Sequence, residues 1–549
     1  MRVALFSVGL VLSAAELFAA GIFSYARQGN IFTFKLADGS AELEWISASS
    51  FRFCRRWQAA AEKPRPISED AVAVAVSDLD ARLELATKYL KVEVAKEGLL
   101  LKVRDGAGAL LAADAAVIRR AGDGFVIARE TPDTERFRGL GVGGGASADG
   151  ARGVKIQTGV PFLLSSLGYG EYYRGAAGYL FDLASTTPGR RRVELRGANR
   201  VESFFYHGPT PKEILEQHVA VSGGLGEVVW ADYRLRDGAP LPKDATALPP
   251  PRSVSWEGLR ETLRSLYEAS YSAILLPAFD ASPFLATGGA LARRAAQLAS
   301  VMPVLYQSRS GLGAGEKTEL AAARARLVPY LVSYGYEADD RGFPLIRPMA
   351  MQYPRDKEAA GLSDQFLLGD DLLVAPILGP DGGRSVYLPM GAWTDLRNNQ
   401  AYKGRQTIQI TAGANDLPLF AKNGSIVPLA PVSEAGPLEL HYFPSLAAEL
   451  FYYEEGTGGL TQFHAAPAAG FMRLEIEPVL GRTCEWVVHH VEPCRRVVAG
   501  QVEYAPVAER RQLRPGAWHY DARRRNLHVQ VRVRAGADSI INVSFADGG

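Results

Sequence analysis

The chain has 549 residues, which is too long for one hydrophobic core and predicts about three to four domains. Its 61 lysines and arginines nearly balance its 60 aspartates and glutamates, which leaves a formal net charge of +1. This balance gives no electrostatic footprint for nucleic acid, so we expect no nucleic-acid partner. Hydrophobic residues at 47% and charged residues at 22% are typical of an ordinary soluble globular protein.

The first 21 residues have the pattern of a secretory signal peptide. Arg2 precedes an apolar run from Val3 to Leu12, and Ser13-Ala14-Ala15 supplies small residues for cleavage. We therefore expect export to the periplasm or the exterior, and no stable membrane insertion after cleavage. The alternative is an uncleaved membrane anchor over residues 3–24, but Glu16 lies in mid-span, where a carboxylate is costly in lipid.

The three cysteines also depend on where the protein is located, because an exported protein can form disulfides. Cys484 and Cys494 could pair across a hairpin, which would leave Cys54 over. Three reduced, buried thiols are the alternative, and the sequence leaves both open.

Residues 22–222 are predicted to be mostly β-structure. The stretch from Lys88 to Leu111 alternates apolar and polar residues and is broken by Glu-Gly and Asp-Gly pairs, which are typical of hairpin turns. The glycine-rich run Gly139–Gly145 has no helix signature after it. We therefore interpret it as a tight turn and not as a nucleotide site.

The middle of the chain alternates helix and strand. Ser255–Ser272 predicts an amphipathic helix with a serine N-cap, Ala273–Phe279 a buried strand, and Thr287–Leu305 a second helix. A further helix is predicted after them, with Thr318 as its N-cap. The run Pro249–Pro251 is a stiff linker and cannot be a central strand. Beyond Gly342 short apolar runs separated by turn residues predict β-structure to the end of the chain.

Several segments closely resemble glycoside hydrolase family 31, the α-glucosidase and α-xylosidase family. They occur in the family's order, at Glu135–Gly145, Gly159–Tyr173, Phe204–Gly223, Arg324–Pro354, Asp364–Leu378, Ser385–Gly404 and Asp416–Pro431. The resemblance implies a mostly β fold with a small α/β part. We expect a galactose-mutarotase-like N-terminal β-sandwich, part of a (β/α) barrel, and proximal and distal C-terminal β-sandwiches.

The resemblance also places the domain boundaries. It implies an N-terminal sandwich over 22–222, the barrel part over 223–345, the proximal sandwich over 346–431 and the distal sandwich over 432–549. The barrel part has 123 residues, whereas a complete (β/α)8 barrel takes about 250. We therefore expect a truncated barrel with fewer than eight strands.

The family's chemistry is a retaining hydrolysis of α-linked sugars, which needs two carboxylates about 5–5.5 Å apart. The Trp-x-Asp-Met-Asn-Glu type motif that carries the nucleophile is absent from this sequence, and Pro250–Val254 replaces the Gly-Asp pair that supplies the acid. An Asp-Ile-Gly-Gly-Phe type loop survives only as Asp280 and Phe284. Tyr306 and Ser308 replace the sugar-contacting Arg-x-His pair.

The resemblance makes Asp280, Phe284 and Trp256 the candidates for substrate binding. Asp232 and Asp280 are the candidate catalytic residues if the carboxylates are relocated. The ordinary interpretation is that Asp232 is a solvated loop acid and that Asp280 caps a turn. No spacing among the eight histidines predicts a metal site, since the adjacent His489 and His490 would point to opposite faces of a strand. No cofactor is expected.

Three functions stay open at this point. The first is a family 31 relative without catalysis, which binds an α-linked oligosaccharide or another glycan or acts as a scaffold. The second is an active retaining α-glycosidase with relocated carboxylates. The third is a partner subunit that docks on another protein through its open barrel edge, because exposed strand edges must be covered or paired.

Overall fold

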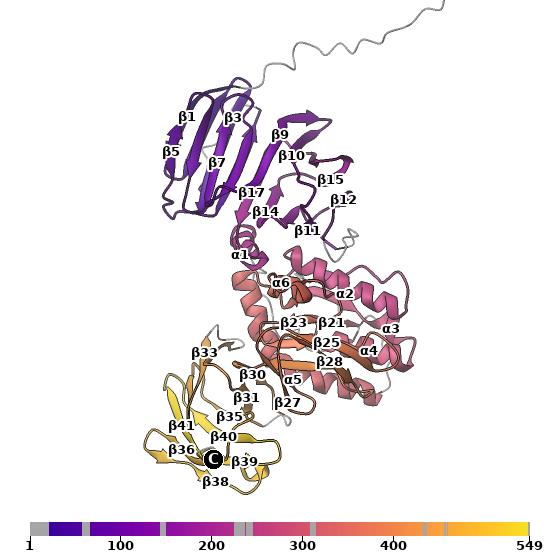
Figure 1. Cartoon of the computed structure of the whole chain (residues 1–549), viewed down its shortest axis with the longest axis vertical. Coiled ribbons are helices and arrows are strands. Elements are labelled where there is room, and N and C mark those ends of the chain that lie inside the picture. The colour runs from indigo at the N-terminus through magenta and orange to yellow at the C-terminus, as the bar shows by residue number, and fades with distance from the viewer. Residues whose placement is uncertain are drawn as a thin grey trace, which may run out of the picture. The chain divides into compact units, whose positions relative to one another are not determined.

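The computed structural model describes residues 21–57, 66–142, 150–223, 236–237, 245–307, 314–431, 436–454, 457 and 459–546. The chain divides into two compact units, Met1–Val221 and Ser222–Gly549 (Figure 1). The predicted signal peptide lies outside the described residues, so export stays a prediction. No helix in the described part of the chain combines the length and apolar character needed to cross a bilayer.

The first unit is a sandwich of two antiparallel sheets whose facing residues form its core. The eight-stranded sheet has the order β1 (Ile22–Gln28), β2 (Ile31–Leu36), β3 (Gly39–Ser47), β4 (Ser50–Arg56), β17 (Val201–His207), β14 (Tyr169–Arg174), β13 (Phe162–Ser165) and β11 (Phe137–Gly139). The nine-stranded sheet has the order β12 (Lys155–Thr158), β15 (Gly178–Thr187), β16 (Arg190–Arg196), β10 (Gly124–Glu130), β9 (Leu110–Ala121), β8 (Leu101–Asp105), β7 (Leu90–Ala95), β6 (Arg82–Ala86) and β5 (Ala75–Asp78). The predicted hairpin pattern of residues 88–111 is confirmed, because β7, β8 and β9 are consecutive antiparallel neighbours.

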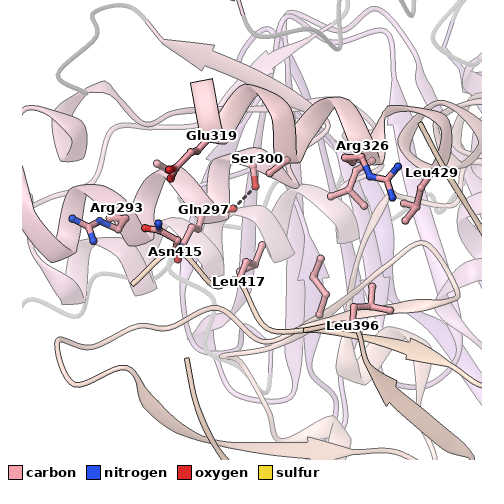
Figure 2. A pocket seen from close by; sticks show the side chains of 13 residues that line it. Arg293, Gln297, Ser300, Glu319, Arg326, Leu396, Asn415, Leu417 and Leu429 are labelled. Atoms are coloured by element: carbon pink, nitrogen blue, oxygen red, sulfur yellow. Dashed lines mark hydrogen bonds between the residues drawn. The ribbon is translucent and has the colours of Figure 1, made fainter. Parts of the chain in front are cut away.

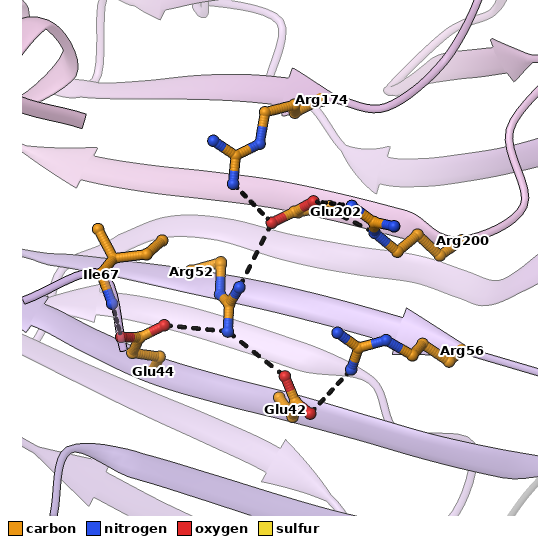
Figure 3. A network of polar contacts seen from close by, with 8 residues as sticks. All are labelled: Glu42, Glu44, Arg52, Arg56, Ile67, Arg174, Arg200 and Glu202. Atoms are coloured by element: carbon orange, nitrogen blue, oxygen red, sulfur yellow. Dashed lines mark hydrogen bonds and ion pairs between the residues drawn. The ribbon is translucent and has the colours of Figure 1, made fainter. Parts of the chain in front are cut away.

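Charged side chains are buried in this sandwich in closed networks. Arg191 is 1% exposed and its Nη2 lies 2.7 Å from Glu171 Oε2, while Arg129 Nε lies 2.9 Å from Glu171 Oε1. Burial opposes ionisation, but the two guanidinium groups hold the pKa of Glu171 below its usual value. Figure 3 shows a second network, in which Glu202 and Arg52 join charges from four neighbouring strands.

The first unit ends in α1 (Pro211–Ser222), which covers an aromatic part of the eight-stranded sheet. The ring of His218 stacks on Phe162 at 4.0 Å between centroids, and its Nδ1 lies 3.4 Å from Tyr206 Oη. Burial lowers the pKa of His218 to about 3, so this histidine is neutral in the folded protein at ordinary pH.

The second unit begins with a four-stranded parallel sheet and the longer helices. The sheet has the order β18 (Arg236–Asp237), β21 (Val304–Gln307), β20 (Pro277–Asp280) and β19 (Thr246–Ala247). The helices are α2 (Trp256–Tyr271), α3 (Ser282–Leu285), α4 (Gly289–Ser300), α5 (Ala314–Arg341), α6 (Met349–Gln352) and α7 (Lys357–Ala360). Residues from α2 to α5 and from β20 form one apolar core with the next domain. In the described residues this sheet has four strands and not the eight of a closed barrel.

Three local predictions for this region need correction. The strand predicted at 273–279 begins only at Pro277, because Ala273 has a left-handed φ of 56° and lies in the turn after α2. The helix predicted over Thr287–Leu305 spans only Gly289–Ser300, because Gly288 has a left-handed φ of 65° before it and the strand β21 begins at Val304. Thr318 is not an N-cap, since α5 already begins at Ala314. By contrast, the predicted cap of α2 is confirmed: the side chain of Ser255 accepts the Gly258 N–H at 3.2 Å.

Two β-rich layers follow the helices, as predicted, and the fold is mostly β. The proximal part has a sheet of β22 (Ile346–Pro348), β23 (Phe366–Leu368), β24 (Leu372–Val374), β29 (Leu419–Lys422), β26 (Ala392–Asp395) and β27 (Gln400–Lys403), and a pair of β25 (Gly383–Leu388) with β28 (Gln406–Thr411). Only the single-turn helices α6 and α7 interrupt this part.

The distal part is a second sandwich around its own core. One sheet has the order β30 (Ser425–Leu429), β31 (Leu438–Phe443), β35 (Arg482–Val488), β40 (Asn526–Val533), β39 (Ala517–Asp521) and β38 (Ala505–Pro506). The other has β32 (Ala448–Tyr453), β33 (Leu460–Ala468), β34 (Phe471–Glu477), β41 (Ser539–Phe545), β36 (Cys494–Ala499) and β37 (Val502–Glu503). Cys484 and Cys494 lie in different sheets, and both thiols are free, as is that of Cys54.

Buried histidines connect the distal and proximal parts. His489 Nε2 lies 3.0 Å from His441 Nδ1, and His489 Nδ1 lies 2.7 Å from the side-chain oxygen of Asn399. Burial, together with the neighbouring His441, lowers the pKa of His489 well below its usual value. His489 therefore acts as a neutral hydrogen-bonding group in the folded protein.

Candidate functional site

The carboxyl ends of the four parallel strands meet at one edge of the sheet, where barrel proteins place their reactive residues. Asp280 of β20 is in register with Tyr306 of β21, and Tyr306 is in register with Arg236 of β18. These three residues form one row across three strands. Asp237 and Gln307 form the next row toward the carboxyl end. Two carboxylate residues, a guanidinium residue and a phenol residue therefore belong to the same edge.

Asp280 is the best-defined member of this row. It is half-buried at the end of β20, and its Oδ1 accepts the backbone N–H of Ser282 at 2.9 Å. This Asx-type bond starts α3, and aspartate is favoured at such turns because its side chain can replace a backbone acceptor. The predicted turn-capping role is therefore what the structure displays, and a substrate role for the same carboxylate stays a prediction.

The other candidates from the sequence lie in different surroundings. Trp256 is the first residue of α2, the helix that follows β19 along the chain, and it is half-buried against the apolar core. Phe284 has 0% exposure, and its ring lies 6.1 Å from that of Phe279 inside the core. Asp232 and Ser308 lie outside the described residues. The register brings Tyr306 and Asp280 together and leaves Phe284 in the core.

Sequence reasoning missed Asp237 and Arg236. They occupy a strand of only two residues, and so short a segment has no detectable alternation. The one local signal is an Arg-Asp pair directly before Gly238, which is typical of a strand that ends in a turn.

Perturbed carboxylates away from this edge serve the scaffold. Burial raises the pKa of Asp371 to about 6, although the Tyr334 hydroxyl donates a hydrogen bond to it at 2.6 Å. The neighbouring Asp370 pairs with the fully buried Arg347, which links α5 to the proximal sheet. No cluster of histidine, cysteine and carboxylate residues in the described ranges has a geometry that could hold a metal ion.

A cavity of about 300 Å³ lies elsewhere in the second unit, between α4, α5 and the proximal sheet (Figure 2). Five leucines are among its lining residues: Leu327, Leu396, Leu417, Leu419 and Leu429. Among the described residues, its lining includes none from the parallel sheet.

Comparison with known proteins supports the resemblance seen in the sequence. Residues 342–427 match the model of the glycosyl hydrolase family 31 C-terminal domain. The chain is 25% identical over 361 residues to an isomaltosyltransferase of Sporosarcina globispora, covering 57% of this chain and 33% of that protein. It is 37% identical over 108 residues to neutral alpha-glucosidase AB of Mus musculus, covering 19% of this chain and 11% of that protein. Residues 342–427 therefore form a family 31 C-terminal domain, and the chain is similar to family 31 proteins beyond it.

Solved structures agree with this family 31 fold. A Flavobacterium johnsoniae GH31 dextranase complexed with glucose gives a TM-score of 0.77 at 16% identity, covering 96% of this chain and 100% of that one. The cycloalternan-forming enzyme of Listeria monocytogenes, complexed with a pentasaccharide substrate, gives 0.79 at 15% identity, covering 96% of this chain and 77% of that one. The chain spans about a third or less of the length of the curated relatives it matches. Family 31 comprises glycosidases and transferases of carbohydrate metabolism.

Proposed function

We propose that this chain binds α-linked gluco-oligosaccharides at the carboxyl edge of its four-stranded sheet and does not hydrolyse them. The observation that carries the proposal is the composition of this edge. Asp280 is held in a turn there, while the motif that supplies the family's nucleophile is absent from the sequence. Relatives whose complexes contain glucose and isomaltotriose support the ligand class.

The chemical reason lies in what hydrolysis requires. A general acid–base group contributes roughly 10²–10⁴-fold, and loss of the nucleophile removes the covalent route altogether. A binding site has no such requirement. Hydroxyl groups of a sugar both donate and accept, and the Asp280 carboxylate at this edge is an acceptor for them.

One observation favours a second candidate, hydrolysis by relocated carboxylates. Asp237 and Asp280 end strands that are separated by one other strand, β21. Two spacings of about 4.8 Å put their backbones roughly 10 Å apart. This is a distance between backbones and not between carboxyl groups, and Asp237 lies one residue beyond the row of Asp280, where alternation places neighbouring residues on opposite faces. Hydrolysis with inversion would need the two carboxyl groups about 6.5–9.5 Å apart. The original candidate pair of Asp232 with Asp280 belongs to the same hypothesis.

The test measures turnover and binding on the same preparations. Wild type is incubated for long periods with aryl α-glucosides and α-xylosides, and we expect no turnover above background. Isomaltotriose binding is measured by calorimetry, and we expect Asp280→Asn to weaken it about tenfold or more, since a hydrogen bond to a charged group is lost. The substitution keeps a side-chain oxygen for the Ser282 N–H, so the turn persists.

A matched control exists in the other unit. Asp105 also caps a turn, accepting the N–H groups of Ala107 and Ala109, and Asp105→Asn leaves isomaltotriose binding unchanged. Turnover that disappears in Asp280→Asn together with Asp237→Asn or Asp232→Asn would replace the proposal with the second candidate. Absence of both turnover and saturable isomaltotriose binding would refute both.

A further inference from the structure

Two cavities lie end to end along one face of α4. The first, of about 270 Å³, is lined on α4 by Ala290, Arg293 and Arg294. The second, of about 300 Å³, is lined on α4 by Arg293, Ala296, Gln297 and Ser300. The segment 412–419 follows the same course, with Ala412 and Ala414 in the first cavity and Asn415, Leu417 and Leu419 in the second. Because Arg293 borders both, the two cavities are neighbours along α4, and we call the pair the α4 groove.

The wall opposite α4 is fixed by hydrogen bonds. Arg294 Nη1 donates to the Asp416 carbonyl at 3.0 Å, and Gln297 Nε2 donates to the Ala414 carbonyl at 2.9 Å. Arg294 and Gln297 also bond to each other at 2.9 Å. These bonds hold the backbone of residues 412–416 against α4, so the groove is formed before any ligand enters.

The two halves of the α4 groove differ in chemistry. The first half is polar, with Asp381 and two arginines, and Gly382 has a φ of 70° that brings its turn close to Ala412. The second half is lined by five leucines and two alanines, with polar groups toward both ends. Figure 2 shows Arg293, Asn415 and Glu319 gathered at that end, away from Leu396 and Leu429. Arg326 lies at the opposite end, beside Leu429, and pairs with Glu439 at 2.8 Å. The leucines therefore lie between the polar groups of the first end and this ion pair.

We propose that the α4 groove binds an amphipathic glycoside, with the sugar in the polar half and an apolar aglycone along the leucines. The polar part of the groove has two carboxylates and a guanidinium: Asp381 lines the first cavity, Glu319 the second, and Arg293 both. This mixture of acceptors and donors matches hydroxyl groups, which do both. A simple anion would instead meet two carboxylates, and a simple cation would meet the guanidinium of Arg293. Each half has the volume of a small ligand group, at the lower end of the range for small-molecule sites, about 300–1,000 Å³.

The lining of the α4 groove predicts how the sugar and the aglycone share the binding affinity for the glycoside. None of the described residues that line its two halves is aromatic, so a free sugar finds no ring to stack on. The aglycone therefore supplies most of the affinity, and each methylene group that it buries should raise the association constant about fourfold. This site goes beyond the sheet edge and stands whether or not that edge binds oligosaccharides.

The test is a calorimetric titration of the full-length protein with ethyl, butyl and hexyl α-glucosides, with glucose and hexanol as partial ligands. We expect affinity to rise with chain length, and both partial ligands to bind at least tenfold more weakly than hexyl α-glucoside. Leu417→Asn should abolish the dependence on chain length, whereas Leu417→Met should keep it. Asp381→Asn should narrow the preference for hexyl α-glucoside over hexanol.

Control variants separate binding in the α4 groove from binding at the sheet edge and from adsorption to apolar surface. Leu446→Asn introduces the same change at a leucine that is 72% exposed, and it should alter nothing. Asp280→Asn should also leave hexyl α-glucoside binding unchanged, which distinguishes the α4 groove from the sheet edge. Circular dichroism melting confirms that each variant is folded. Equal binding of hexanol and hexyl α-glucoside, affinity unaffected by Leu417→Asn, or no saturable binding at millimolar ligand would each overturn the proposal.

Discussion

The N-terminal sandwich and the four-stranded sheet of the second unit differ in how much of their architecture depends on distant chain segments. Most neighbouring strands of the sandwich are joined by short turns, and their registers run over up to seven paired residues. The parallel sheet has strands of two to four residues that are brought together only through helices. Parallel pairing needs such crossovers, whereas antiparallel pairing needs only a hairpin.

This difference indicates which parts of a family 31 protein can change independently. A sandwich made of hairpins keeps its core when a separate domain is shortened. In a (β/α) barrel each strand pairs with the strands on both sides, so removing one β/α unit leaves another strand without a partner. Each removed unit also takes away the site residue at the carboxyl end of its strand. The two regions also bury charge differently, since the sandwich encloses ion pairs whereas the helices around the parallel sheet enclose a mainly apolar core.

The largest expected effect tests the buried charges of the sandwich. Arg191→Met should destabilise the first unit by about 3–5 kcal/mol, because Glu171 keeps a buried charge with one partner fewer. The measurement is denaturant-dependent hydrogen exchange of the amides of β10 and β16 in the intact protein. Arg196→Met is the control, since its pair with Glu194 is exposed on both sides and should contribute less than about 1 kcal/mol. Equal effects of the two substitutions would show that the network contributes nothing beyond a surface pair.

A smaller effect is expected from acid, which should destabilise each unit through one buried histidine. The folded-state pKa of His218 and that of His489 lie below the unfolded value near 6.5. Their contribution to stability is therefore present above pH 6.5 and is lost as the pH falls toward the folded pKa. Between pH 7 and pH 5 His218 should reduce the free energy of unfolding by about 2 kcal/mol, and His489 should change it in the same direction.

Denaturation at pH 7, 6 and 5 measures this loss, with hydrogen exchange assigning it to one unit or the other. His218→Phe should remove the acid sensitivity of the first unit alone, because the ring that stacks on Phe162 no longer titrates. His464→Gln is the control at a partly exposed histidine and should leave both profiles unchanged. A first unit that stays equally acid-sensitive without His218 would contradict this assignment.

The smallest effect separates packing from substrate contact in the parallel-sheet region. Phe284→Leu should cost about 1 kcal/mol of stability, because the substitution is close in volume and the site is fully buried. Isomaltotriose binding should not change. Trp256→Leu, at the start of α2, should weaken binding instead. If Phe284→Leu lowered the affinity for isomaltotriose without changing stability, Phe284 would contact substrate, as the resemblance implies. Its buried position in the core would then not describe the protein with substrate bound.

Local patterns determined much of this protein directly from its sequence. The Ser255 cap, the helical stripe that follows it and the hairpins of residues 88–111 need only neighbours within a few residues, and all of them are present in the structure. The mostly β fold followed for the same reason. The missing nucleophile motif is also a property of the sequence alone, since no folding can supply an absent residue.

The tertiary structure decided what depends on distant pairing and burial. Arg236, Tyr306 and Asp280 are far apart in the sequence, and only strand order places them in one row. The α4 groove likewise needs Arg294 and Gln297 to hold a segment that lies more than a hundred residues away. Periodicity specifies the face that each element buries, whereas the partner that covers it is selected by the free energy of the whole core.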